Sequence, residues 1–235
     1  MIAAMSETTI VLCDDHALVR GGMRALLDAE PDLAVVGEAA DGADAVELVL
    51  RLRPDVVLMD VELPLLDGIE ATARLRAAGA RAHVLVVTTF DDDDYLVRAL
   101  RAGAAGFVLK SASPARLTEA VRTVARGEAL IDPTTTRRLV ERLLAAPPRD
   151  DAARDRLATL TAREREVLRA LARGGSNAAI GRALGLSEPT VKGHVTQLLA
   201  KLGVASRVQA VVFAYESGFV RAGEASASWE PARRR

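Results

Sequence analysis

The chain has 235 residues, half of them apolar, and a formal net charge of -1, which suits one large domain or two modest ones. No apolar run approaches the ~18 residues of a membrane span, and the start, MIAAMSETT, lacks the basic and long apolar regions of a signal peptide. Cys13 is the only cysteine, which excludes a disulfide framework or a cysteine-based zinc site within the chain. We therefore expect a cytoplasmic protein without a membrane partner.

Short apolar runs and helical periodicity alternate in the front half. The predicted strands are 8–13, 32–39, 55–59, 83–88 and 106–110, and the predicted helices are 16–30, 42–53, 68–79, 93–103 and 113–127. Parallel strands need crossover connections, which the intervening helices supply. This order predicts an α/β fold, a five-stranded doubly wound parallel sheet, over residues 7–127.

The pattern changes after residue 127. Residues 128–157 hold a short amphipathic helix, Pro147-Pro148 and a stretch of mixed charge, which together predict an interdomain linker. Residues 158–222 carry only helical patterns and predict an all-α domain of four helices. The remainder, 223–235, is small, polar and basic, and we predict a disordered tail.

Charge is distributed unevenly between these parts. Residues 7–127 carry 13 Lys and Arg against 20 Asp and Glu, whereas residues 158–222 carry 9 against 4. An acidic front half favours a metal or phosphate site, and a basic rear half favours a nucleic-acid-binding module. Lysine occurs only at Lys110, Lys192 and Lys201. For Lys201 we accept chance retention as the explanation.

Charged and hydroxyl side chains stand at the ends of the predicted strands. Asp14 and Asp15 follow the first strand, Asp60 follows the third, Thr88 ends the fourth and Lys110 ends the fifth. The carboxyl ends of parallel strands share one edge of the sheet, where ligands of such folds bind. We therefore expect these five side chains to lie together.

Three carboxylates at one edge repel one another unless a cation joins them. Mg²⁺ (or Mn²⁺) takes oxygen ligands from carboxylates, waters and phosphate groups. With such a metal bound, Asp60 can stay ionised and attack phosphorus as a nucleophile. Lys110 and the Thr88 hydroxyl would then neutralise and position the phosphoryl group.

Four segments in this half resemble the receiver domain of bacterial two-component response regulators: LCDDH (12–16), LMDVELPLLDG (58–68), VVTTF (86–90) and AAGFVLK (104–110). The resemblance implies a flavodoxin-like fold with Asp60 as the phosphoacceptor. It also implies that Asp15 is a direct magnesium ligand, that Asp14 acts through water, and that the Glu62 backbone carbonyl completes the protein ligands. Lys110 would pair with the phosphoryl group, and Thr88 and Phe107 would be the hydroxyl and the aromatic that rearrange on phosphorylation.

Each of these residues also has an ordinary structural explanation. Asp14 alone would more often cap a helix, and Asp60 alone would form a turn. The acidic run 91–94 is best explained as a solvated loop that caps the next helix. Many receivers have a proline after the lysine, in a cis peptide, whereas Ser111 follows Lys110 here. A cis bond before serine would cost ~3 kcal/mol, and the sequence leaves open whether the bond is cis or trans.

Residues 158–220 resemble the LuxR-type helix-turn-helix through LTAREREVL, SNAAIGRALGLSEPTVKGHV and LLAKLGVASRVQAV. In a helix-turn-helix the second helix enters the major groove of DNA. Lys192 and Thr196 lie one turn apart on the face opposite an apolar stripe, with Gly193 beside them. Thr190 and Arg207 are candidate contacts to the DNA backbone. Because Gly193 offers no side chain, we expect sparse base contacts and a large share of phosphate contacts.

The two resemblances together imply a response regulator of the NarL/FixJ type. The predicted function is that of a transcription regulator, not an enzyme, which a partner histidine kinase phosphorylates at Asp60. Double-stranded DNA is the second partner, and a homodimer is the expected active form. The alternatives are a DNA-binding regulator independent of phosphorylation and a magnesium-dependent aspartyl-phosphate hydrolase.

Overall fold

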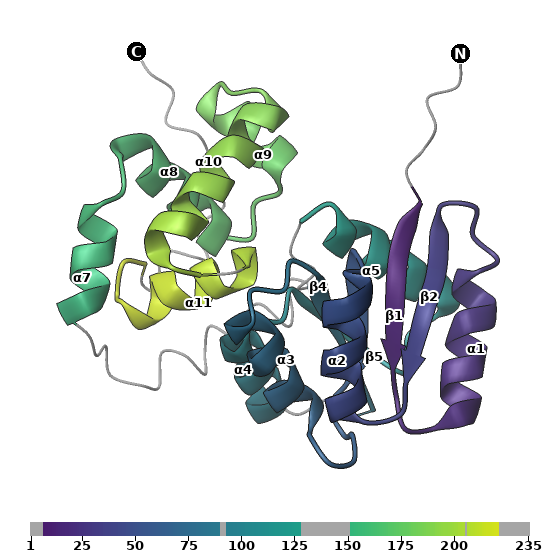
Figure 1. The fold of residues 1–235 in the computed structure, drawn as a ribbon. Coiled ribbons are helices and arrows are strands. Elements are labelled where there is room, and N and C mark those ends of the chain that lie inside the picture. The colour runs from purple at the N-terminus through teal and green to yellow at the C-terminus, as the bar shows by residue number, and fades with distance from the viewer. Residues whose placement is uncertain (1–6, 90–92, 128–150, 205, 221–235) are drawn as a thin grey trace. The chain divides into compact units, whose positions relative to one another are not determined.

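A computed structural model describes residues 7–89, 93–127, 151–204 and 206–220 (Figure 1). The chain divides into two compact units, Met1–Leu130 and Ile131–Arg235, and each is described by itself. The predicted short helix within 128–150 and the predicted tail at 223–235 lie outside the described residues.

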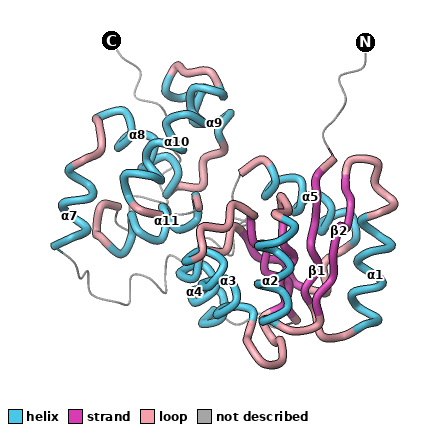
Figure 2. Tube along the Cα trace, viewed as in Figure 1, coloured by secondary structure: helices cyan, strands magenta, loops and turns pink. Residues whose placement is uncertain are grey.

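The first unit is a five-stranded sheet in the order β2-β1-β3-β4-β5, and every pair of neighbouring strands is parallel. Figure 2 shows the strands of this sheet in magenta with helices around them. This confirms the predicted α/β fold class. Its strands are β1 (Thr8–Cys13), β2 (Leu33–Ala39), β3 (Val56–Asp60), β4 (His83–Thr88) and β5 (Gly106–Leu109). Its helices are α1 (Ala17–Leu27), α2 (Gly42–Leu52), α3 (Gly68–Ala77), α4 (Asp93–Ala102) and α5 (Pro114–Ala125).

Helices cover both faces of this sheet (Figure 1). Alternate residues of β1, such as Ile10 and Leu12, join one buried cluster with apolar side chains of α1 and α5. Helices α2 and α3 pack side by side over the other face, and α3 contacts α4. Strand β3 has helices on both sides, so all five of its residues are buried, including Asp60 at its end.

The loop from β3 to α3 is held close to the end of its own strand by a glycine. A Cβ atom at Gly68 would lie 1.8 Å from the backbone oxygen of Asp60, so no other residue fits without moving the loop. The Gly68 N–H donates to the Val61 carbonyl oxygen at 2.9 Å, and the Asp67 carboxylate caps α3 through the N–H of Glu70. These contacts fix the backbone on the carboxyl side of Asp60.

The second unit contains helices only. They are α7 (Asp151–Ala158), α8 (Ala162–Ala172), α9 (Asn177–Leu184), α10 (Glu188–Leu202) and α11 (Arg207–Glu216). The sequence placed residues 151–157 in a linker, whereas the structure places them in α7. The Arg156 guanidinium donates to the Leu202 carbonyl at the end of α10 and lies 4.8 Å from the ring centre of Phe213 in α11. Helix α7 therefore packs on α10 and α11, in addition to the four predicted helices.

Helices α9 and α10 form the predicted helix-turn-helix. Ser176 caps α9, Gly185 ends it in the left-handed conformation with φ 68°, and Ser187 caps α10. A Cβ at Gly181 would lie 2.7 Å from the Leu186 carbonyl oxygen, so glycine lets the turn fold back onto α9. Thr161 and Glu164 form a capping box at the start of α8.

Among the described helices, none is long and apolar enough by itself to cross a membrane. One bent pair, α10 with α11, meets the requirement by length and composition alone.

Candidate functional site

The strand-end residues of the first unit meet at one edge of the sheet. Asp14 directly follows β1 and Asp60 ends β3, and these two strands are neighbours at the point where the strand order reverses. Thr88 ends β4, the next strand along, and Lys110 directly follows β5. The structure therefore brings these four predicted residues to the same edge.

Lys110 joins the two buried carboxylates. Its Nζ lies 2.7 Å from Asp60 Oδ2, where it donates a hydrogen bond, and 2.6 Å from Asp14 Oδ2 as an ion pair. Asp14 and Asp60 are 2% and 5% exposed, so water cannot screen their mutual repulsion, and the ammonium is the charge that opposes it.

Burial and the lysine act in opposite directions on the acidity of this cluster. Burial raises the pKa of Asp60 above its ordinary value, although the hydrogen bond and charge of Lys110 oppose the rise. Burial alone would lower the pKa of Lys110, but its hydrogen bonds to Asp14 and Asp60 raise that pKa. The site thus holds a carboxylate that is costly to ionise beside a lysine that stays charged.

Thr88, Phe107 and Glu62 surround this pair. Thr88 is buried, and its backbone oxygen accepts a 2.7 Å hydrogen bond from the Lys110 N–H, which ties the ends of β4 and β5 together. Phe107 is half-buried in β5 opposite Val86, and Glu62 is exposed in the loop after β3. There is no cis peptide bond within the described residues, so the bond between Lys110 and Ser111 is trans.

Asp15 and His16 form the exposed part of the cluster. Carboxylate or ring atoms of Asp14, Asp15 and His16 all lie within 4.8 Å of one another, and His16 Nδ1 lies 2.6 Å from Asp15 Oδ1. Sequence reasoning missed His16, although its position directly after two aspartates was a usable signal. A cleft of about 420 Å³ opens beside Asp15 and is lined further by Glu62, Asp67 and Tyr95.

A divalent cation fits this arrangement. The two buried carboxylates of Asp14 and Asp60 share the ammonium of Lys110, so a cation would offset the negative charge that remains. Asp15 stands at the solvent side, where waters could complete an oxygen-rich coordination. Receiver domains generally bind Mg²⁺ at an acidic pocket of this kind.

In the second unit, α10 divides into a buried and an exposed face. Val191, Val195 and Leu198, which belong to the apolar stripe, are buried, whereas Leu199 is only half-buried. The four residues predicted to contact DNA from this helix are all exposed: Thr190, Lys192, Gly193 and Thr196. The Thr196 hydroxyl donates to the Lys192 carbonyl oxygen at 3.0 Å.

Arg207 differs from its predicted role. It is 9% exposed, and its guanidinium donates to Asn177 Oδ1 at 2.9 Å and to the Gly175 carbonyl oxygen. These bonds join the start of α11 to the start of α9 and leave the side chain inside the unit. The structure therefore does not support Arg207 as a contact to a DNA phosphate.

Lys201 also differs from its predicted role, because it anchors α10 to α8. Its Nζ lies 2.8 Å from both carboxylate oxygens of Glu164, which is 2% exposed and also accepts from the Thr161 N–H. Burial alone would raise the pKa of Glu164, but the hydrogen bonds from Lys201 and Thr161 lower it. Chance retention is therefore the wrong explanation for this lysine.

Comparison with known proteins finds a matching family for each of the two units of the chain. Residues 10–122 match the response regulator receiver domain, and residues 158–214 match the bacterial regulatory proteins of the luxR family. The chain belongs to the response regulators that join a receiver to a LuxR-type DNA-binding domain. This membership confirms the predicted family and the predicted function as a transcription regulator rather than an enzyme, and it implies a histidine kinase and DNA as partners.

Relatives match this response regulator over most of its length. The transcriptional regulatory protein DegU of Brevibacillus brevis is 41% identical over 92% of this chain and 96% of its own. The uncharacterized transcriptional regulatory protein YxjL of Bacillus subtilis (strain 168) is 40% identical over 90% and 97%. The receiver domain of the response regulator NarL from Mycobacterium tuberculosis is 36% identical, with a TM-score of 0.52 over 52% of this chain and 99% of that structure.

The raised pKa of Asp60 leads to a prediction about stability without metal. Its folded-state pKa lies above the unfolded value, so its ionisation penalises folding at neutral pH, and the penalty is relieved as pH falls through the folded-state pKa. In metal-free buffer at pH 7, we expect Asp60→Asn to raise the free energy of unfolding of the receiver by about 1 kcal/mol. Urea unfolding followed by receiver amide NMR signals measures this gain.

Millimolar Mg²⁺ should stabilise the wild-type receiver and leave Asp60→Asn nearly unchanged, because a ligand stabilises only the state that binds it. Asp44→Asn, an exposed carboxylate on α2, is the control and should respond to Mg²⁺ like the wild type. Equal stabilisation of Asp60→Asn and wild type would contradict the assignment of the cation to this cluster.

The lowered pKa of Glu164 predicts an acid-sensitive second unit. A carboxylate with a depressed folded-state pKa stabilises the fold above its unfolded pKa of about 4.5 and loses that contribution as pH falls through the folded-state value. At pH 7, Glu164→Gln should cost about 1–3 kcal/mol and should flatten the pH dependence below 5. Glu166→Gln, on the exposed side of α8, is the control, and an equal loss in both variants would refute the anchoring role.

Proposed function

We propose that this response regulator is switched by transfer of a phosphoryl group from a histidine kinase to Asp60, in the cytoplasm. The observation that carries the proposal is the buried cluster in which Lys110 contacts both Asp60 and Asp14 at the switch point of the sheet. In the transfer, a carboxylate oxygen of Asp60 bonds to phosphorus, the bond from phosphorus to the kinase imidazole breaks, and the electron pair leaves with that nitrogen.

The residues around Asp60 have distinct parts in this transfer. Lys110 is charged and within reach of Asp60 Oδ2, so it can move from the carboxylates to the new phosphoryl oxygens. Asp14, Asp15 and Asp60, with the backbone carbonyl of Glu62, would hold Mg²⁺ (or Mn²⁺). When bound, the metal neutralises the negative charge that gathers on the phosphoryl group. The cleft of about 420 Å³ beside Asp15 gives the phosphodonor access.

The switch would act through the backbone hydrogen bond that joins the ends of β4 and β5. Because the Lys110 N–H bonds to the Thr88 carbonyl, a shift of Lys110 toward a phosphoryl group acts on both strand ends. The Thr88 hydroxyl would donate a hydrogen bond to the phosphoryl group. The half-buried Phe107 would then repack into the space that the Thr88 side chain leaves. Two arrangements of these residues form the two states whose populations phosphorylation shifts.

The output of the switch is DNA binding by a homodimer. Thr190, Lys192, Gly193 and Thr196 form the exposed face of α10 that would enter the major groove, and paired units would contact inverted half-sites one helical turn apart. A regulator that ignores phosphorylation would not need Asp14, Asp60 and Lys110 buried together. A hydrolase is disfavoured by the family to which the chain belongs.

Phosphodonor treatment tests the switch. With Mg²⁺ and a small phosphodonor such as acetyl phosphate, we expect the wild-type protein to dimerise and to bind its DNA at least tenfold more tightly, about 1.4 kcal/mol. Asp60→Asn should show neither change, and Thr88→Ala should accept the phosphoryl group without dimerising. Light scattering and fluorescence anisotropy measure the two readouts, with Asp44→Asn as the control. Equal binding by wild type and Asp60→Asn under all conditions would contradict the proposal.

The salt dependence of DNA binding tests the role of α10. If Lys192 contacts a phosphate, Lys192→Ala should weaken binding to all sequences alike and reduce the slope of log affinity against log salt by about 1. Thr196→Ala should weaken binding to the preferred site more than to random DNA, because its exposed side chain would lie against base edges in the groove. Arg74→Ala, on the receiver, controls for loss of one positive charge. Unchanged affinity and preference in both α10 variants would refute this contact face.

A further inference from the structure

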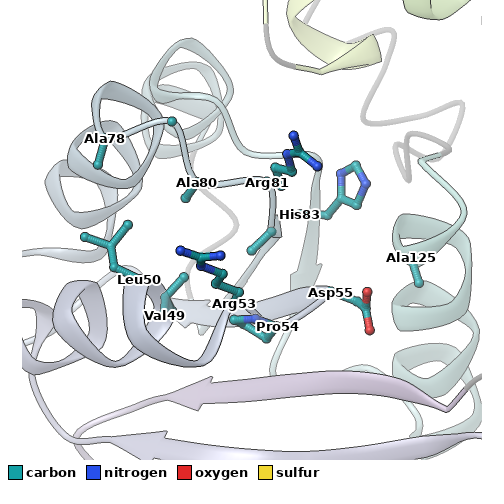
Figure 3. A pocket seen from close by; sticks show the side chains of 12 residues that line it. Val49, Leu50, Arg53, Pro54, Asp55, Ala78, Ala80, Arg81, His83 and Ala125 are labelled. Atoms are coloured by element: carbon teal, nitrogen blue, oxygen red, sulfur yellow. The ribbon is translucent and has the colours of Figure 1, made fainter.

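A second pocket lies at the amino-terminal edge of the receiver sheet, at the opposite end of β3 from Asp60. It measures about 630 Å³, within the range of small-molecule sites. Its walls come from the ends of α2, α3 and α5 and from the starts of β3 and β4 (Figure 3). We call it the basal pocket, and its polar lining consists of Arg53, Asp55, Arg81 and His83.

The two arginines of the basal pocket are exposed, and neither forms an ion pair or side-chain hydrogen bond with a described residue. Arg81 lies in the loop before β4, His83 is the first residue of β4, and Arg53 projects from the end of α2 (Figure 3). The carboxylate of Asp55 is occupied instead, because its Oδ2 accepts from the Thr9 N–H at 2.9 Å and the Thr9 hydroxyl at 2.7 Å. The pocket lining therefore carries two guanidinium charges against one carboxylate, and that carboxylate already accepts hydrogen bonds from Thr9.

The backbone around these charges is held in place. Arg53 has a left-handed φ of 51° directly before Pro54, a conformation that costs free energy for a residue with a side chain. Across the pocket, the Arg76 guanidinium donates to the carbonyl oxygens of Ala80, Ala82 and Gly103 and so pins the loop that carries Arg81. Because the backbone that carries the two arginines is held, only their side chains need to become ordered when an anion binds.

We propose that the basal pocket binds a small organic phosphate monoester. The phosphate oxygens would accept hydrogen bonds from the two guanidiniums, whose planar donors suit them, and His83 also lines the pocket. Phosphate alone is too small for the volume, and the remaining walls are apolar, formed by Val49, Leu50, Pro54, Ala78, Ala80, Ala82 and Ala125. The site does not depend on phosphorylation of Asp60, because none of its lining residues belongs to that cluster.

Titration of the full-length protein with phenyl phosphate tests the proposal, with backbone amide NMR signals as the readout and without divalent metal. We expect saturable shifts at Arg53, Arg81 and His83, weaker binding of inorganic phosphate, and weaker binding of benzoate, which has the same ring but a single charge. Arg53→Gln and Arg81→Gln should each raise the dissociation constant about tenfold. Arg51→Gln, in the same helix but outside the pocket, should bind like the wild type.

Three results would overturn the proposal: no saturable shift with millimolar phenyl phosphate, shifts unchanged in both pocket variants, or equal loss in Arg51→Gln. Acetyl phosphate labelling of Asp60 in Arg53→Gln and Arg81→Gln checks that each variant is folded and separates this site from the phosphoacceptor. Weaker binding by either Arg53→Gln or Arg81→Gln suffices to support the site. If one variant does not fold, the other still tests the proposal.

Discussion

The burial of two carboxylates beside one ammonium is the constraint around which the receiver is arranged. Asp14 and Asp60 lie at the ends of neighbouring strands with almost no access to water, and Lys110 contacts both. Removal of the lysine would leave two like charges in a medium that screens them poorly. The strand order brings the three side chains together, and their charges in turn require an accurate position for each strand end. The same balance of charges makes the site responsive, because negative charge added at Asp60 would redistribute the contacts of Lys110.

The second unit also pairs a buried carboxylate with a lysine, and there the pair joins two helices. Glu164 is buried at the start of α8 and is neutralised by Lys201 from the last turn of α10. This pair sets the rotation of α10 about its axis, since Lys201 must face α8. The residues on the far side of α10, among them Lys192 and Thr196, are then exposed to solvent. The ion pair and the buried apolar side chains of α10 together therefore leave this far side as the face that DNA can meet.

The two edges of the receiver sheet have opposite electrostatic character. The carboxyl edge gathers aspartates, for which a cation and a phosphoryl group are the natural ligands. At the basal edge, the described pocket lining carries Arg53 and Arg81 against one carboxylate, Asp55, which accepts hydrogen bonds from Thr9. One β3 strand of five residues separates them. Ligands at the two ends would therefore contact opposite ends of the same buried strand without sharing a residue.

Local patterns in the sequence determined much of this protein. Apolar runs and helical spacing located all five strands, and the strand-end positions of Asp14, Asp60, Thr88 and Lys110 were enough to predict their convergence, because parallel strands share an edge. Long-range pairing was decided only by the tertiary structure. Lys201 pairs with Glu164, which lies 37 residues away in the sequence. Arg207 points into the unit and bonds to Asn177. Residues 151–157 form a helix that packs on α10 and α11. Such partners depend on how helices pack, and helical periodicity in one segment does not carry that information.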